Sequence, residues 1–165
     1  MESRTVAETR VIMTQLMHPE DANLAGNVHG GTIMKLIDNA AGVVAIRHCR
    51  SNSVTASVDR IDFHNPAYIG DLLVIKASMN LVGRTSMEIG ARVESERLIS
   101  GERYHIASAY LTYVALDENF KPQAAPPLIS ETADERRRNQ EAQARRKTRL
   151  EEKQQETACQ DKLCE

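Results

Sequence analysis

The most continuous apolar run in the 165-residue chain lies between Ile33 and Ile46. Four residues interrupt it: Lys35, Asp38, Asn39 and Gly42. A helix built from this run would be apolar on nearly every face, and such helices are normally buried. The run is shorter than the roughly 20 apolar residues that a membrane span requires. It therefore predicts a helix at the centre of a core, ending near residues 47–52.

Five further segments carry the patterns typical of strands. They span residues 9–17, 54–63, 72–82, 87–98 and 104–116. Short turns join the last four, so we expect these strands to be antiparallel neighbours in chain order. The order strand, helix, four strands predicts an α+β fold in which a five-stranded antiparallel sheet wraps around the central helix. Such a sheet leaves a face and an edge to cover, which favours self-association.

The two ends of the chain differ from this core in composition. We expect residues 1–8 to be a flexible N-terminus and residues 9–129 to form the domain. Residues 130–165 are rich in Glu, Gln, Arg, Lys and Ala and predict a charged C-terminal helix or tail. Two interpretations of its arginines stay open: a solvated helix face, which is the commoner case, or contacts with a phosphate-bearing ligand or a neighbouring subunit. The arginines concerned are Arg136, Arg137, Arg138, Arg145 and Arg146.

Charge and cysteine content narrow the function classes. The formal net charge of −2 gives no global indication of nucleic-acid binding or of binding to an anionic membrane. No apolar leader opens the sequence, so we expect no secretion signal. The three cysteines, Cys49, Cys159 and Cys164, are odd in number and lack zinc-ligand spacing. They predict free thiols in a reducing, cytoplasmic compartment, with no metal site and no cofactor.

The candidate chemistry lies where the polar stretch before the central helix meets that helix. Gly30 and Gly31 suit the helix start, where N–H groups without helical partners attract developing negative charge. Asp38 follows Gly31 by about two turns, so both face one side of the helix. The residues alone leave two explanations of this carboxylate equally open: a structural hydrogen bond or ion pair, or catalysis.

In order and spacing, four groups of residues resemble the hotdog-fold acyl-CoA thioesterases, the acyl-CoA hydrolase branch that forms hexamers as trimers of dimers. The similarity covers about residues 9–150. The groups are Asn23, Gly26, Gly30, Gly31 and Asp38; Ser57, Val58, Asp59, Ile61, Phe63, Pro66, Gly70 and Asp71; residues 83–88; and residues 112–115. Each group alone is a weak signal, whereas all four in order are specific.

The resemblance implies hydrolysis of fatty acyl-CoA, of medium to long chain, at a dimer interface. In the family, the residue at the Asp38 position is the essential carboxylate, and the residue at the Asn23 position comes from the other subunit. The backbone N–H near Gly31 is the expected oxyanion donor, and some members bind a regulatory nucleotide. For the reaction we prefer Asp38 as a general base on water over direct attack by its carboxylate.

Further residues near these motifs are candidates for substrate binding or catalysis, and most of them also have an ordinary structural explanation. Gly30 and the turn residues Arg84, Thr85 and Ser86 are candidates for binding CoA, although an ordinary hairpin turn explains the last three equally well. We interpret His29 as a turn residue that lines the cleft rather than as an acid or base.

Two alternative functions fit the same fold. One is a non-catalytic acyl-CoA sensor, which would lack the carboxylate or carry a DNA-binding segment. The other is an enoyl-CoA hydratase, which would place an Asp/His pair on the loop before the helix.

Overall fold

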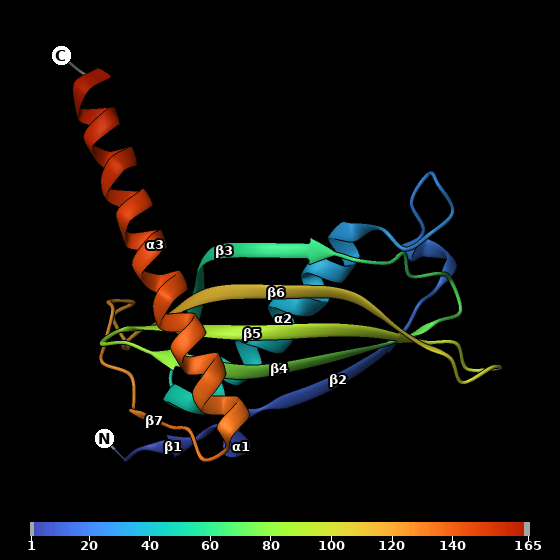
Figure 1. The fold of residues 1–165 in the computed structure, drawn as a ribbon, viewed down its shortest axis with the longest axis horizontal. Helices are drawn as coiled ribbons and strands as arrows, with labels where there is room; N and C mark the ends of the chain where they lie inside the picture. Colours follow the sequence, from blue (N-terminus) through green and yellow to red (C-terminus); the bar gives the residue numbers. More distant parts are fainter. Residues whose placement is uncertain (1, 164–165) are drawn as a thin grey trace.

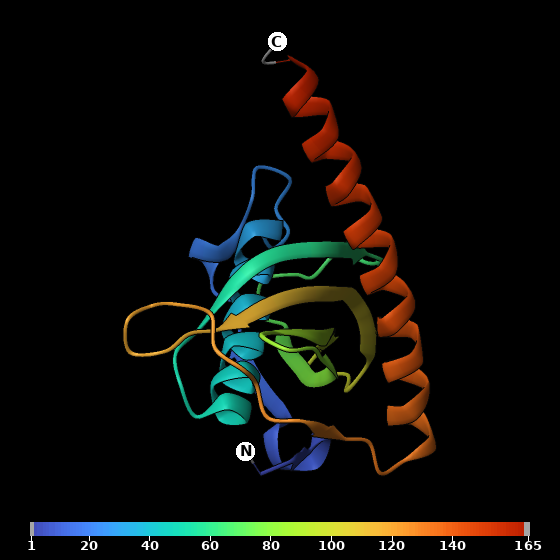
Figure 2. The same cartoon turned by 90° about the vertical axis from the view of Figure 1, so that its left-hand side faces the viewer.

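The computed structural model describes residues 2–163, and the side chains of residues 2–156. One antiparallel sheet of five strands lies between two long helices, α2 (Gly30–Cys49) and α3 (Ala133–Leu163), on opposite faces (Figures 1 and 2). The strands are β2 (Val11–Leu16), β3 (Ser53–Phe63), β4 (Leu72–Val82), β5 (Ser86–Glu96) and β6 (Arg103–Ala115). The predicted sheet around a central helix, with a charged C-terminal helix, is confirmed.

Helix α2 packs against the sheet with one face only. That face is almost completely buried and consists of Ile33, Ile37, Ala40, Ala41, Val44 and Ala45. On other sides, Met34, Val43 and Ile46 remain 37–47% exposed. The expectation of burial on all sides is therefore wrong for a single chain, because one sheet can cover only one face of a helix. The exposed apolar side needs another cover.

The order of strands across the sheet is β2-β4-β5-β6-β3. The predicted neighbours β4, β5 and β6 are confirmed, but β3 lies beside β6 rather than beside β4. Residues 64–71 cross the end of the sheet, where the Val28 N–H donates to the Ala67 carbonyl (2.8 Å) and the Met17 N–H to the Asp71 carbonyl (2.9 Å). A connection of this length can reach the opposite edge, whereas a tight hairpin turn cannot. As a result, β3 is an edge strand.

Residues 4–9 form regular secondary structure, within the stretch for which the sequence predicted a flexible end. β1 (Arg4–Thr5) pairs in parallel with β7 (Leu128–Ile129), and α1 (Val6–Thr9) follows with a reciprocal Thr5–Glu8 capping box. A short 3-10 turn (Pro19–Asp21) then leads toward α2. A two-residue strand and a one-turn helix are too short to show periodicity, which explains why the sequence pattern missed them.

Some arginines of α3 follow the first expected interpretation, and one follows neither. Arg137 and Arg138 pair with Asp134 on α3, as a solvated helix face predicts. Arg145 instead binds Glu88 on β5 at 2.7 Å, so the sheet of the same chain is its partner. Cys159 and Cys164 lie beyond the side chains that the structure describes. Among the described residues, none of the helices is long and apolar enough to cross a membrane.

Candidate active site

Two hydroxyl groups hold the Asp38 carboxylate on α2. Thr55 Oγ1 donates to Asp38 Oδ1 at 2.6 Å, and the Tyr113 hydroxyl donates to the same oxygen at 2.7 Å. The Tyr113 hydroxyl also lies 2.8 Å from the Asp38 carbonyl oxygen. Thr55 and Tyr113 are register partners on β3 and β6, so the pairing of two strands brings both donors to one carboxylate.

This arrangement leaves one oxygen of the Asp38 carboxylate open. Within residues 2–156, no cation pairs with Asp38 and no donor contacts its Oδ2 atom. Burial, together with the neighbouring Asp38, raises the pKa of Tyr113 well above its ordinary value. The phenol therefore stays protonated at neutral pH and acts as a donor. One oxygen is held in place, and the other can accept a proton.

The start of α2 differs from the expected free oxyanion site. His29 is the N-cap residue, and its Nδ1 atom accepts a hydrogen bond from the Gly31 N–H at 2.9 Å. The imidazole lies so close that a Cβ atom on Gly31 would be 3.0 Å from Nδ1, so a larger residue there would have to push the His29 ring aside. The cap satisfies an N–H that has no helical partner. Gly31 can serve an oxyanion only after the His29 ring turns away.

Asn23 lies in the loop before α2 and does not contact Asp38 of the same chain. Its Oδ1 atom accepts from the Ala25 N–H at 2.9 Å, and its Nδ2 atom donates to Asn27 Oδ1 at 2.5 Å. Within one chain Asn23 is a turn residue. Its catalytic role stays a prediction about a second chain.

The turn Arg84–Thr85–Ser86 lies at the other end of α2 from Gly30. Next to this turn, Met87 Sδ lies 3.2 Å from the sulfur of Cys49, the last residue of α2. The carbonyls of Arg84 and Thr85 accept hydrogen bonds from Ala125 and Ala115. Thus the described contacts do not join the turn to Asp38, and its role in CoA binding stays a prediction.

Two cavities open on different sides of the molecule. One, of about 360 Å³, lies at the start of α2 and is lined by Asn27, Val28, Gly30, Ile33, Phe63, His64, Asn65, Pro66 and Ala67. Gly30 thus lies where a ligand could approach the helix start. The other, of about 430 Å³, lies on the outer face of the sheet beneath α3, away from Asp38.

The described residues support neither a metal site nor a cysteine nucleophile. Among the described residues, no cluster of three or more His, Cys, Asp or Glu side chains could hold a metal ion. Cys49 is partly buried, and burial raises the pKa of its thiol. Buried thiols of raised pKa are poor nucleophiles.

Comparison with known proteins agrees with the fold. Residues 25–100 match the family model "Thioesterase superfamily". The cytosolic acyl coenzyme A thioester hydrolase of Mus musculus is 42% identical over 146 residues, which cover 87% of this chain and 38% of that protein. The uncharacterized acyl-CoA thioester hydrolase YkhA of Bacillus subtilis is 40% identical over 81% of this chain and 78% of its own length.

Solved structures are similar over nearly the whole chain. An apo-hexameric acyl-CoA thioesterase superposes with a TM-score of 0.89 and 38% identity, covering 92% of this chain and 97% of that one. The acyl-CoA hydrolase of Staphylococcus aureus, solved with butyryl-CoA and CoA, gives a TM-score of 0.90 and 28% identity over 99% of each chain.

The architecture is the hotdog fold. The chain belongs to the thioesterase superfamily, in its acyl-CoA thioester hydrolase branch. It spans 38% of the length of the mammalian cytosolic relatives, so their activity as whole proteins is not transferred to it directly.

Proposed function

We propose that this chain hydrolyses fatty acyl-CoA, of medium to long chain length, to the free acid and CoA. The supporting observation is the Asp38 carboxylate, which two hydroxyls hold at one oxygen while the other is open. Relatives about 40% identical are named acyl-CoA thioester hydrolases. The similar S. aureus hydrolase was solved with butyryl-CoA and CoA, a thioester and a thiol of the proposed reaction's classes.

The spacing of three residues also supports the site. In the S. aureus hydrolase an asparagine, an aspartate and a threonine have each been replaced by alanine. They follow one another at the same two intervals as Asn23, Asp38 and Thr55. Sequence patterns had pointed to Asn23 and Asp38. Thr55 is included in the proposed site because its hydroxyl donates a hydrogen bond to Asp38.

In the proposed reaction, Asp38 acts as a general base. Its free carboxylate oxygen takes a proton from water as the water oxygen attacks the thioester carbonyl carbon. An N–H in the first turn of α2 stabilises the oxyanion, which for Gly31 requires the His29 ring to turn away. The intermediate then breaks its C–S bond, and Asp38 returns the proton to the thiolate. The thiolate is a fair leaving group because thiols have pKa values near about 8.5.

We propose that a second copy completes the site at the β3 edge. Asn23 does not reach Asp38 of its own chain, and β3 pairs with only one neighbour. Val54, Val58 and Phe63 on β3 are 42–50% exposed. Pairing two chains along this edge would cover these apolar residues and the open side of α2. Related structures are described as hexamers, which supports a trimer of dimers.

Replacing Asp38 by Ala tests the function. We expect palmitoyl-CoA hydrolysis, measured by thiol release, to fall on the order of 10³-fold or more, because general bases contribute about 10²–10⁴-fold and the held carboxylate is lost as well. Size-exclusion chromatography should show an unchanged oligomer. Near-normal turnover by this variant would overturn the assignment. Enoyl-CoA consumption without thiol release would instead indicate a hydratase, and acyl-CoA binding without turnover a sensor.

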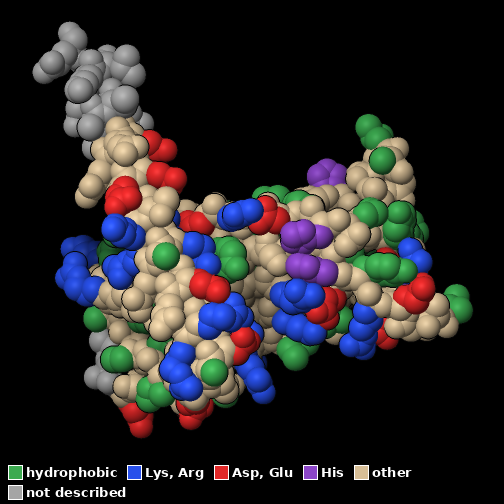
Figure 3. Space-filling model, in the orientation of Figure 1, with side chains coloured by type: hydrophobic (Ala, Val, Ile, Leu, Met, Phe, Trp, Pro, Cys, Tyr) green, Lys and Arg blue, Asp and Glu red, His purple; other side chains and the backbone are tan. Residues whose placement is uncertain are grey.

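The regulatory nucleotide implied for some relatives also stays a proposal, and we assign it to the outer cavity. Cations gather around this cavity beneath α3 (Figure 3): Arg10, Lys76, Arg92, Arg137 and Arg138. Binding of adenine or guanine nucleotides should weaken in Arg137→Ala, and equal binding by the wild type and this variant would place the site elsewhere.

A cytoplasmic location is proposed from the names of the cytosolic relatives. It fits free thiols.

A further inference from the structure

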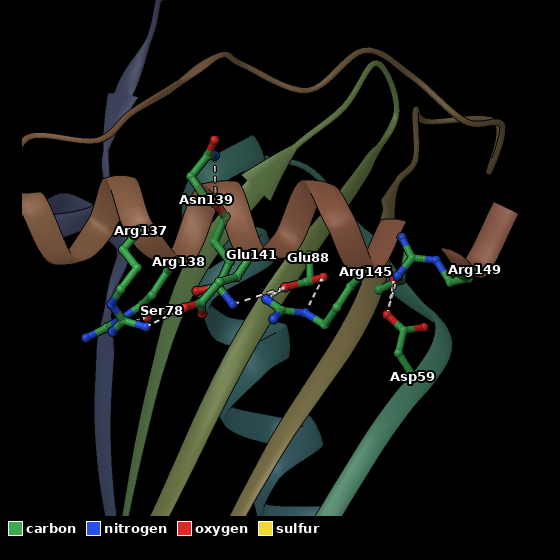
Figure 4. Close-up of polar contacts among 11 residues, drawn as sticks. Asp59, Ser78, Glu88, Arg137, Arg138, Asn139, Glu141, Arg145 and Arg149 are labelled. Carbon is green, nitrogen blue, oxygen red and sulfur yellow. Dashed lines mark hydrogen bonds and ion pairs between the residues drawn. The ribbon is translucent and has the colours of Figure 1, made fainter. Parts of the chain in front are cut away.

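Helix α3 is fastened across the outer face of the sheet by polar side chains that reach three of its strands (Figure 4). Asn139 Nδ2 donates to the Asn80 carbonyl on β4 at 2.8 Å. Arg145 binds Glu88 on β5, whose side chain is only 1% exposed. Arg149, nearly three helical turns after Asn139 and about one after Arg145, pairs with Asp59 on β3. The helix therefore bridges the sheet from β4 to the edge strand.

Asp59 is the centre of the contact at that edge. Its Oδ1 atom accepts from Ser57 Oγ at 2.5 Å, and its Oδ2 atom accepts from Thr112 Oγ1 at 2.9 Å and from Arg149 Nη1. The side chains of Asp59 and Arg149 are 11% and 23% exposed. A carboxylate with three donors and little exposure holds its neighbours in one geometry.

Two irregularities in β3 link this contact to the candidate active site. The register with β6 shifts between Thr55 and Ser57, and again between Val58 and Arg60. In a regular strand, residues 55, 57 and 59 would share one face. The first shift changes the face: Thr55 reaches Asp38 on the α2 side, whereas Ser57 binds Asp59 on the α3 side.

We propose that the Arg149–Asp59 pair is a clamp that fixes the bulged part of β3 and so positions Thr55 against Asp38. Arg149 and Asp59 are then positioning residues for the hydrolysis, and this inference rests on the proposed function. Within one chain, β3 has strand hydrogen bonds on one side only, so β6 and the clamp are the contacts of this chain that hold the bulge. A slip of one residue reverses the face of every side chain, which would take Thr55 away from Asp38.

Arg149→Ala is the direct test, because Asp59 keeps Ser57 and Thr112 as donors and the fold should persist. We expect kcat for palmitoyl-CoA to fall about tenfold or more, since small misplacements of catalytic groups can cost up to about 100-fold. KM should change by less than about threefold, because the clamp does not bind substrate. Amide hydrogen exchange over residues 53–59 should become faster. Asn139→Ala, which frees α3 from β4 instead, should leave kcat and this exchange unchanged.

A double-mutant cycle separates positioning from a general loss of stability. In a Thr55→Val background, Arg149→Ala should lower kcat by less than about twofold, because the residue that the clamp positions is already missing. An equal loss in both backgrounds, or no loss in either, overturns the clamp. If Arg149→Ala does not fold, Asp59→Asn is tested instead, and the same changes in kcat, KM and amide hydrogen exchange are expected. A wild-type protein without hydrolase activity refutes the proposed function, and unchanged exchange in Arg149→Ala then overturns the clamp independently.

Discussion

At the level of single residues, the partners of Asp38 explain how a carboxylate can be held in place while one of its oxygens stays open. An arginine partner would neutralise its charge and occupy its oxygens in a bidentate pair. Thr55 and Tyr113 are neutral donors that hold one oxygen and leave the other open. The arrangement differs from a structural ion pair and supports the proposal that Asp38 is a general base.

Tyr113→Phe should test the contribution of one donor. The ring and its packing beside Gly42 remain, while the hydrogen bond to the carboxylate is lost. A hydrogen bond to a charged group is worth about 1.5–3 kcal/mol, so we expect kcat to fall by roughly one to two orders of magnitude. Tyr104→Phe, on the same strand, removes a hydroxyl that contacts Arg97 and should not change kcat. Equal kcat values for the two variants would mean that Tyr113 only packs.

His48 should make stability depend on pH. It is fully buried at the end of α2, its Nε2 atom lies 2.7 Å from the Pro126 carbonyl, and burial lowers its pKa. The unfolded chain, with a histidine pKa of about 6.5, then binds more protons than the folded chain in acid. The contribution of neutral His48 to the free energy of unfolding is therefore complete above about pH 6.5, and it is lost as the pH falls below this value.

Thermal unfolding from pH 7.5 to 5 would show this as a falling Tm. In His48→Gln, Tm should fall less steeply with pH. Part of the pH dependence remains because the pKa of His105 is also lowered. His18→Gln, a change at an exposed position, serves as the matched control. A His48→Gln slope equal to that of the wild type would contradict the prediction.

The sequence could reveal only those site residues that are neighbours along the chain. Asp38 stood out because a single carboxylate interrupts an apolar helix, and Gly31 because it opens that helix. Thr55 has no local signal, since its meeting with Asp38 depends on the pairing of β3 with β6 and on a bulge. The His29 cap was missed for a different reason: histidine is an uncommon N-cap residue.

At the level of elements, β4 was predictable to the residue, whereas β3 was placed beside the wrong neighbour. Alternating patterns identify a strand but not its partner, which here depends on a crossing connection over residues 64–71. The side of α3 that binds the sheet was also hidden, because Arg145 and Arg149 look like solvated charges until Glu88 and Asp59 are placed opposite them.

Two glycines near α3 should respond differently to replacement by alanine. At Gly90, an added Cβ atom would lie 2.7 Å from Asn80 Nδ2, which is bonded to the buried Glu88. At Gly83, it would meet the end of the flexible Arg146 side chain at 2.9 Å. We expect Gly90→Ala to cost about 1–3 kcal/mol in denaturant unfolding, and Gly83→Ala much less, because Arg146 can move aside and Asn80 cannot. Equal costs would show that Asn80 also rearranges freely.

At the level of the whole molecule, a single chain leaves two apolar surfaces uncovered, which supports the proposed second copy. One side of α2 keeps Met34, Val43 and Ile46 exposed, and the edge strand β3 adds Val54, Val58 and Phe63. Large apolar patches beside an unpaired strand edge mark an interface. Asp38 lies between these two surfaces, so a partner placed there would close the site.

Mixing two inactive variants tests whether the site is shared. If each site combines Asp38 of one protomer with Asn23 of the other, a dimer of one Asn23→Ala chain and one Asp38→Ala chain has one intact site and one doubly defective site. Random pairing should therefore restore about a quarter of wild-type activity per chain. A control mixes wild type with the Asn23→Ala/Asp38→Ala double variant in equal amounts. Shared sites leave about a quarter of the full activity there, and sites within one protomer leave about half. Co-expression with two affinity tags ensures that mixed dimers form; mixed dimers without restored activity would show that Asn23 does not act on its neighbour's Asp38.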